Sequence, residues 1–467
     1  MNAHEKKNYS NLFSTNIEKI VILFCSSILL IYALLSLYGG TSVLVFGTVL
    51  LLLITPLVYF FQELSKVKGL VLGFIFVVTY KSLFLLTKLI VLSDQPKNAL
   101  IINDAAGYIA SAFNPNIIEL VLNYGIDLGY VFFLKTLVQL FSISSFDIPI
   151  IFVLPNIFLS SLIVVFSVYL ARVVFPSLNP IYVFWVAAID PMLANFSTVA
   201  LKDSLVATFV SVSLVVFITK RKFILQLIIW ILSMIASFTL RYRSFPIIAG
   251  LIGSRILFGY ELSKATKIIF TTVLSCILIF TLFLGALTNL NFLNRGKSIL
   301  DTEKTHVEKL AIKGQADIKN TGRLGFIINN LPSFPLRVSA RTLMSFLAPI
   351  PPVQFYQFSW GSGSSDLQAR IFRDLGGIYW YIMMPFSLLG IFYFLKKKQY
   401  FLPLSLFIVI LAMGIGGWVD ARMRLMAIVP IYILIATGLS ENKFVNLFSI
   451  GFYSALLISW LSYEIIF

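Results

Sequence analysis

The sequence predicts an all-α integral membrane protein whose helices cross the bilayer many times. Of its 467 residues, 59% are hydrophobic and only 12% are charged, and the mean hydropathy is +0.93. Soluble domains are about half apolar and about one quarter charged, so a soluble protein of this length could not hide so much apolar surface. Apolar runs of about 17–25 residues, the length of a transmembrane helix, recur from Ile20 to the C-terminus without an intervening soluble domain.

These runs predict a polytopic bundle of about 12–14 transmembrane helices in one membrane domain, residues 1–467. The predicted spans are residues 20–38, 42–61, 70–92, 148–170, 180–198, 204–219, 223–240, 245–260, 268–289, 377–395, 399–418, 424–439 and 443–463. A further apolar segment, 334–353, contains Arg337 and Arg341 and is expected to lie on the membrane or dip into it. The first run lacks a small-residue cleavage site, so it is expected to be a retained anchor.

Basic residues in short loops predict the orientation, because lysine and arginine accumulate in cytoplasmic loops. One side of the predicted topology collects Lys6, Lys7, Lys66, Lys68, Arg172, Lys220, Arg221, Lys222, Lys264, Lys267, Lys396, Lys397, Lys398 and Lys443. This side is therefore expected to be cytoplasmic and to hold the N-terminus.

The predicted topology requires that residues 93–147 remain outside without crossing. The stretch 128–142 within this segment is apolar but short and contains Lys135, Thr136 and Gln139, which favours an amphipathic helix at the outer membrane surface. The alternative, in which 128–142 crosses, moves the basic loop 220–222 to the outside. The outer side then holds this first loop, with its surface helices, and one long loop at 290–376.

The sequence lacks the motifs that mark several classes of function. Cys25 and Cys276 lie within apolar spans, which argues against a disulfide framework, and the two histidines are His4 and His306. The sequence has no HExxH, CxxC or P-loop motif, and no GxGxxG motif that precedes a helix. The formal net charge of +16 is not gathered on one soluble module, so nucleic-acid binding is not expected.

Five polar clusters are predicted to meet at the outer membrane face. They are Asn103-Asp104 with Tyr108, Asp190-Pro191, Lys202-Asp203-Ser204, Arg241-Tyr242-Arg243, and Asp420 to Arg424. Asp104 is the candidate catalytic residue, because a carboxylate can act as a general base toward a hydroxyl or hold Mg²⁺ or Mn²⁺ against a phosphate. The alternative is a loop residue or the N-cap of a helix that begins at Ala105. No metal-ligand set is assigned.

Asp190 and Pro191 interrupt a predicted span. An ionisable side chain at membrane depth is costly, so it is a functional candidate. Pro191 breaks the helix and leaves backbone groups that need partners. The alternative is that Asp190 caps a short helix beginning at Pro191.

The other three clusters place cationic side chains where the positive-inside rule disfavours them. The candidate substrate-binding residues are Tyr108, Asp190, Lys202, Arg241, Arg243, Asp420, Arg422 and Arg424. The planar fork of arginine matches phosphate oxygens bidentately, so these clusters predict an anion site. The alternatives are ion pairs, such as Arg422 with Asp420, or snorkelling to lipid headgroups.

Several of these pieces together resemble a known superfamily. The pieces are Asp104 to Tyr108, Tyr130 to Phe141, Asn156, Asp190-Pro191 and Lys202 to Ser204. The region from Asp104 to about Val216 thus resembles the N-terminal half of C-type membrane glycosyltransferases, which take sugars from polyprenyl phosphate carriers. Asp420 to Arg424, followed by Pro430, resembles a late outer turn of that superfamily, and polymerases of bacterial O-antigen and capsule are similar in their many spans, long outer loop and outer arginines.

The resemblance implies a glycosyltransferase at the outer face of the bacterial cytoplasmic membrane. Asp104 would be the catalytic base, and Arg241, Arg243, Arg422 and Arg424 would hold the carrier phosphates and stabilise the departing anion. The expected partners are a polyprenyl (di)phosphate-linked saccharide, membrane lipid and polysaccharide-assembly proteins. Asn103 and Ala105 flank Asp104 where the superfamily often has an Asp-Glu pair. The alternative function is a flippase for lipid-linked oligosaccharide, which is expected to carry cationic residues along a central cavity.

Overall fold

The computed structural model describes residues 17–92, 100, 105–114, 116, 128–143, 150–218, 223–240, 268, 272, 331, 333–347, 364–400, 402–404, 406–407, 410–411, 425–440 and 451. Over these residues the fold is helical, and they contain no β-strand. The elements are α1 Ile17–Gly39, α2 Ser42–Ser65, α3 Leu70–Val91, α4 Ala105–Phe113, α6 Leu128–Phe141, the 3₁₀ turn η4 Ile150–Phe152, α7 Leu154–Val174, α8 Pro180–Ala188, α9 Pro191–Ser197, α10 Asp203–Ile218, α11 Phe223–Leu240, α16 Phe334–Leu347, α18 Ser364–Lys396 and α20 Ile428–Ser440.

Four described helices are long and apolar enough to cross a membrane. They are Ser42–Ser65, Leu70–Val91, Ile150–Val174 and Leu375–Lys396. A 22-residue helix such as α3 is about 33 Å long, close to the hydrocarbon thickness of a bilayer. The described residues therefore form an all-helical fold with four candidate membrane-spanning helices, as expected of a membrane protein. The larger span count stays a prediction, because several predicted spans lie outside the described residues.

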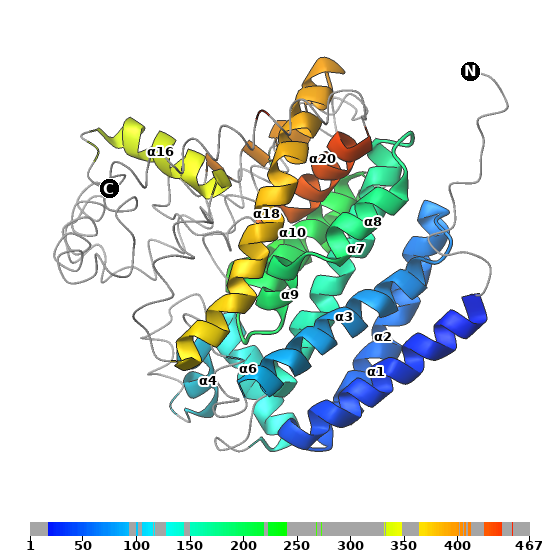
Figure 1. Cartoon of the computed structure of the whole chain (residues 1–467), viewed down its shortest axis with the longest axis vertical. Helices are drawn as coiled ribbons and strands as arrows, with labels where there is room; N and C mark the ends of the chain where they lie inside the picture. The colour runs from blue at the N-terminus through cyan, green and yellow to red at the C-terminus, as the bar shows by residue number, and fades with distance from the viewer. Residues whose placement is uncertain are drawn as a thin grey trace.

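Helix α7 forms the centre of the bundle. It packs against α2, α3, α8 and α10 (Figure 1), and its side chains from Leu154 to Ala171 are buried except that of Leu159, which is half-buried. Its few hydroxyls, such as those of Ser161 and Ser167, donate to carbonyls one turn back in the same helix. A helix that is apolar around its whole circumference has to be covered on all sides, and the surrounding helices cover it.

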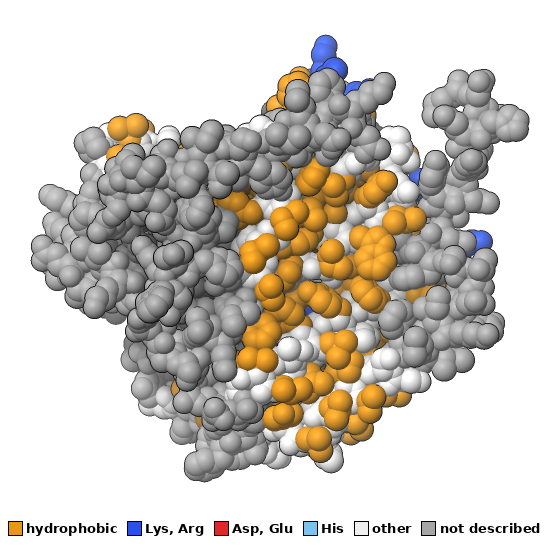
Figure 2. Space-filling model, in the orientation of Figure 1, with side chains coloured by type: hydrophobic (Ala, Val, Ile, Leu, Met, Phe, Trp, Pro, Cys, Tyr) orange, Lys and Arg blue, Asp and Glu red, His pale blue; other side chains and the backbone are white. Residues whose placement is uncertain are grey.

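Helix α2 shows the opposite pattern and presents apolar side chains outward. Leu52 and Leu53 are 68% and 69% exposed. Figure 2 shows apolar side chains in a broad band across the face it views. A patch of this size is unusual on the water-exposed surface of a soluble protein, but it is the surface expected against lipid chains.

Helices α18 and α20 pack in close backbone contact through two glycines. A Cβ atom at Gly390 would collide with the backbone of Leu434, and one at Gly438 would collide with the backbone of Phe386. Small residues let transmembrane helices approach closely and gain van der Waals contact. This contact fixes the position of Tyr432 on α20 relative to α18.

Three basic loops lie at one end of the bundle, which we call the basic end. Phe61, near the end of α2, contacts Phe166 and Tyr169 of α7 with ring centroids 5.2 and 5.3 Å apart. Phe175, just after α7, contacts Phe394 of α18 at 5.2 Å. These contacts bring together Lys66 and Lys68 just after α2, Arg172 in the last turn of α7, and Lys396, Lys397 and Lys398 at the end of α18. That this end faces the cytoplasm remains a prediction, and the basic residues expected there at 6–7, 220–222, 264–267 and 443 lie outside the described residues.

The opposite end, which we call the site end, gathers other segments. Leu100 accepts a hydrogen bond from the backbone of Ala200, and the rings of Phe113 and Phe152 lie 6.3 Å apart. Phe46 contacts Phe141 at 4.7 Å. The beginning of α2, the end of α4, helix α6, η4 and the turn before α10 therefore share the site end.

Three segments can be compared with the sequence predictions. The predicted span 180–198 is divided into α8 and α9 at Ile189 and Asp190, where Pro191 predicts a break. Residues 128–142 form α6, whose 14 residues extend about 21 Å, less than the hydrocarbon thickness of a bilayer. Segment 334–353 contains the 14-residue α16. Whether α6 and α16 lie at the membrane surface stays a prediction.

Candidate functional site

Two clusters of buried polar side chains occur among the described residues. The site-end cluster comprises Tyr108, Tyr130, Asn156, Lys202 and Asp203, which are at most 6% exposed. The second, which we call the mid-bundle cluster, surrounds the break between α8 and α9. It comprises Lys81, Asp190 and Tyr432, with Tyr80 and Tyr379 beside them. Polar groups buried inside a membrane protein are costly unless they find partners, so each cluster calls for an account of its contacts.

The site-end cluster brings together two residues that the sequence singles out. The Lys202 ammonium lies 5.1 Å from the centroid of the Tyr108 ring, a cation–π contact that is strongest where water is excluded. Tyr108 in turn meets Tyr130 edge to face, with centroids 5.3 Å apart. Two of the predicted binding residues, 94 positions apart in the chain, therefore share one site.

Tyr130 extends this cluster toward α7 and α10. Burial, and the nearby negative charge of Asp203, raise the pKa of Tyr130 above its usual range. The phenol therefore stays protonated and remains a hydrogen-bond donor. Asp203 is the first residue of α10, where a carboxylate is favoured by the helix dipole. The arrangement offers a cation, a hydroxyl and a carboxylate within one buried cluster.

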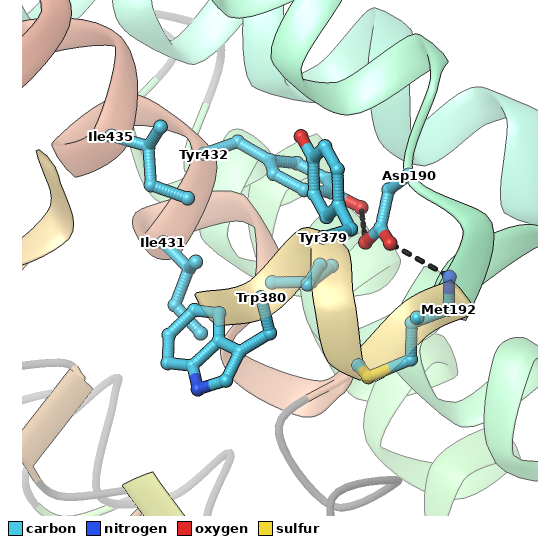
Figure 3. Close-up of a pocket in the computed structure, with 9 residues that line it drawn as sticks. Asp190, Met192, Tyr379, Trp380, Ile431, Tyr432 and Ile435 are labelled. Atoms are coloured by element: carbon cyan, nitrogen blue, oxygen red, sulfur yellow. Dashed lines mark hydrogen bonds between the residues drawn. The ribbon is translucent and has the colours of Figure 1, made fainter. Parts of the chain in front are cut away.

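Asp190 in the mid-bundle cluster accepts hydrogen bonds at both carboxylate oxygens. One oxygen accepts from the backbone N–H of Met192 at 2.8 Å, so Asp190 is the N-cap of α9. The other accepts from the Tyr432 hydroxyl at 2.6 Å. Figure 3 shows both bonds beside a small pocket between α9, α18 and α20. The capping alternative for Asp190 is thus confirmed, and its substrate-binding role stays a prediction.

Two further tyrosines donate hydrogen bonds to backbone carbonyls at the same break. The last carbonyls of a helix have no partner within it, and in a membrane they cannot turn to water. Tyr379 of α18 donates to the carbonyl of Val186. Tyr80 of α3 donates to the carbonyl of Ile189 at 3.4 Å. Together with Tyr432, these hydroxyls hold the broken helix against three other elements.

The sequence reasoning did not single out two buried lysines in α3. Lys81 and Lys88 are each 1% exposed. The Lys81 ammonium donates to Ser160 at 2.7 Å and interacts electrostatically with Asp190. Lys88 donates to Asn195 at 3.2 Å and to Thr198 at 3.4 Å. The signal was available, because both are charged residues inside an apolar run, which marks a functional or structural site.

The remaining predicted site residues lie outside the part of the chain that the structure describes. They are Asp104, Arg241, Arg243, Asp420, Arg422 and Arg424. The structure therefore leaves their predicted roles as predictions. Among the described side chains, no group of three or more His, Cys, Asp or Glu residues could hold a metal ion.

Comparisons with known proteins add no assignment to this geometry. No protein-family model, no curated protein and no solved structure matches the chain.

Proposed function

We propose that this protein transfers a sugar or an oligosaccharide repeat unit from a polyprenyl (di)phosphate carrier at the outer face of a bacterial cytoplasmic membrane. The reaction would be that of an O-antigen or capsule polymerase or of a single-sugar transferase. The observation that carries the proposal is the contact between Lys202 and Tyr108. Both residues belong to pieces that resemble C-type glycosyltransferases, and both lie at the site end, opposite the basic loops.

The chemistry proposed for this end requires an acceptor activated by a base and a leaving phosphate stabilised by cations. Asp104, one residue before α4, is the proposed base. Lys202 supplies one cation, and Arg241, Arg243, Arg422 and Arg424 are proposed to supply the others. Cations aimed at the charge that develops on a leaving phosphate are among the largest contributions to catalysis. The donor is lipid-linked in this proposal because nucleotide sugars are absent from the outer face.

A flippase for lipid-linked oligosaccharide is the second candidate, and Lys81 and Lys88 are the observation that favours it. Such a protein is expected to carry cationic residues within the membrane. The ammonium groups of both lysines, however, contact side chains of α7 and α9 or the residue that follows α9. These contacts fit packing residues better than residues that line a transport path.

Lysine substitutions at the four outer arginines test the proposed anion site. Each single variant should lower turnover of a polyprenyl diphosphate-linked saccharide, because an ammonium cannot reproduce the bidentate guanidinium fork. In the double variant of Arg243 and Arg422, the fold-decrease in turnover should be smaller than the product of the two single fold-decreases. The reason is that groups that act on one diphosphate work as a unit. The measurement is transfer by purified protein, with membrane expression as the control.

Two other outcomes would contradict the proposal. Unchanged transfer in all five variants would indicate that the arginines anchor headgroups and that no anion site exists. Movement of the same saccharide between vesicle leaflets, without formation of a glycosidic bond by the wild-type protein, would favour the flippase.

A further inference from the structure

Lys202 lies at the end of a short connection that has no regular structure. Helix α9 ends at Ser197 and α10 begins at Asp203, so the segment 198–202 lies outside regular helical bonding. Within it, the N–H of Leu201 donates to the carbonyl of Val199, and the carbonyl of Lys202 accepts from the N–H of Val206. The segment's carbonyl and N–H groups are buried, and a buried backbone group without a partner is costly. The position of Lys202 therefore depends on which groups satisfy this segment.

Asn156 of α7 satisfies two of its carbonyls. The Asn156 side-chain N–H₂ group donates to Val199 at 2.9 Å and to Leu201 at 2.8 Å. The backbone N–H of Ala200, between them, donates to the carbonyl of Leu100 at 3.1 Å. One carboxamide thus holds the backbone on both sides of Ala200 and immediately before Lys202.

Lys88 of α3 holds the other end of the segment. Its ammonium donates to the Thr198 hydroxyl and to the Asn195 side chain in the last turns of α9. Thr198 and Asn195 are both buried, at 0% and 1% exposure. Because α3 and α7 are two of the long helices of the bundle, Lys88 and Asn156 tie the segment to the body of the bundle.

We propose that Asn156 and Lys88 are positioning residues that hold the segment 198–202 so that Lys202 stays against Tyr108. Their hydrogen bonds go to the segment and to α9, so they act through the backbone that carries Lys202. The effect on turnover rests on the proposed function, whereas the effect on the segment itself does not. Both positions require a hydrogen-bond donor, because an oxygen atom is the acceptor in each of these bonds.

Nearly isosteric variants separate donation from packing. Asn156→Asp preserves shape but replaces the donating N–H₂ group with an oxygen facing two carbonyls. Lys88→Met removes the donor, and Lys88→Gln retains an N–H₂ group without the charge. Ser167→Ala is the matched control, because Ser167 is buried in the same helix as Asn156 but bonds only to the carbonyl of Ile163.

Hydrogen exchange and turnover should be measured together on the full-length protein in lipid nanodiscs. Backbone amides of residues 198–203 should exchange about tenfold faster or more in Asn156→Asp and Lys88→Met, because each loses the donors that fix the segment. Amides at the basic end, in residues 66–69 and 397–400, should be unchanged. Lys88→Gln should restore slow exchange, and Ser167→Ala should match the wild type.

Kinetics then distinguish this proposal from the proposed function. With a polyprenyl diphosphate-linked saccharide as the probe, Asn156→Asp and Lys88→Met should raise KM more than they lower kcat, and Lys88→Gln should recover KM. Faster exchange without any turnover by the wild type would support the positioning role and contradict the glycosyltransferase. Wild-type exchange rates at 198–203 in both Asn156→Asp and Lys88→Met would overturn the positioning role.

Discussion

Replacing Asp104 with asparagine is expected to lower sugar transfer about 100-fold or more while the protein still reaches the membrane. Asparagine preserves the shape of the side chain but cannot accept the proton of the attacking hydroxyl, and general-base catalysis typically contributes about 10²–10⁴-fold. The measurement is transfer from a polyprenyl diphosphate-linked saccharide by purified protein. The same variant should bind the donor normally, because the base acts on the acceptor.

Asp127 provides the matched control for this experiment. It is another carboxylate of the predicted outer loop 93–147, but it lies outside the pieces that resemble glycosyltransferases. Asp127→Asn should therefore transfer at nearly the wild-type rate. Near-normal transfer by Asp104→Asn would return Asp104 to a loop or capping role and would remove the proposed base.

Replacing Asp190 with asparagine is expected to destabilise the fold by about 1–3 kcal/mol, the usual cost of leaving a buried hydrogen-bonding group without its proper partner. The variant would leave Lys81 in the bundle without the opposite charge with which it interacts. It would also weaken the bond from Tyr432, which is charge-assisted in the wild type. Thermal unfolding of the purified protein in detergent measures the loss.

Two companion variants make this prediction specific. Tyr432→Phe removes only the bond from the Tyr432 hydroxyl to Asp190 and should cost no more than Asp190→Asn. The double variant Lys81→Met with Asp190→Asn should be more stable than Asp190→Asn alone, because it removes the buried amine whose electrostatic partner the single variant has lost. Equal or greater loss in the double variant would show that Lys81 and Asp190 do not stabilise each other.

The broad architecture could be predicted from local patterns in the sequence. The predicted spans 42–61 and 70–92 correspond to α2 and α3, because long apolar runs admit few other structures in a membrane. The break at Pro191 also followed, because proline lacks the N–H that a continuing helix needs. The N-cap role of Asp190 was one of two alternatives, and only the fold distinguished them.

The contacts within the two clusters could not be derived in the same way. The bond from Tyr432 to Asp190 joins residues 242 positions apart, and no local pattern determines which transmembrane helices become neighbours. For Lys202 and Tyr108 the sequence predicted a common membrane face but no direct contact. Lys81 and Lys88 were not predicted as site residues, although two lysines inside one apolar span indicate a functional or structural site.

Labelling each end of the bundle from one side of the membrane tests the central claim most directly, because the proposed glycosyltransferase requires the site end to face outward. Single cysteines at Lys68, Leu310, Lys397 and Ala421 should be introduced after replacement of Cys25 and Cys276, and intact cells treated with a membrane-impermeant maleimide. We expect labelling at 310 and 421 but at 68 and 397 only after the membrane is opened. Labelling of 68 and 397 from outside, or of all four from one side, would contradict the account.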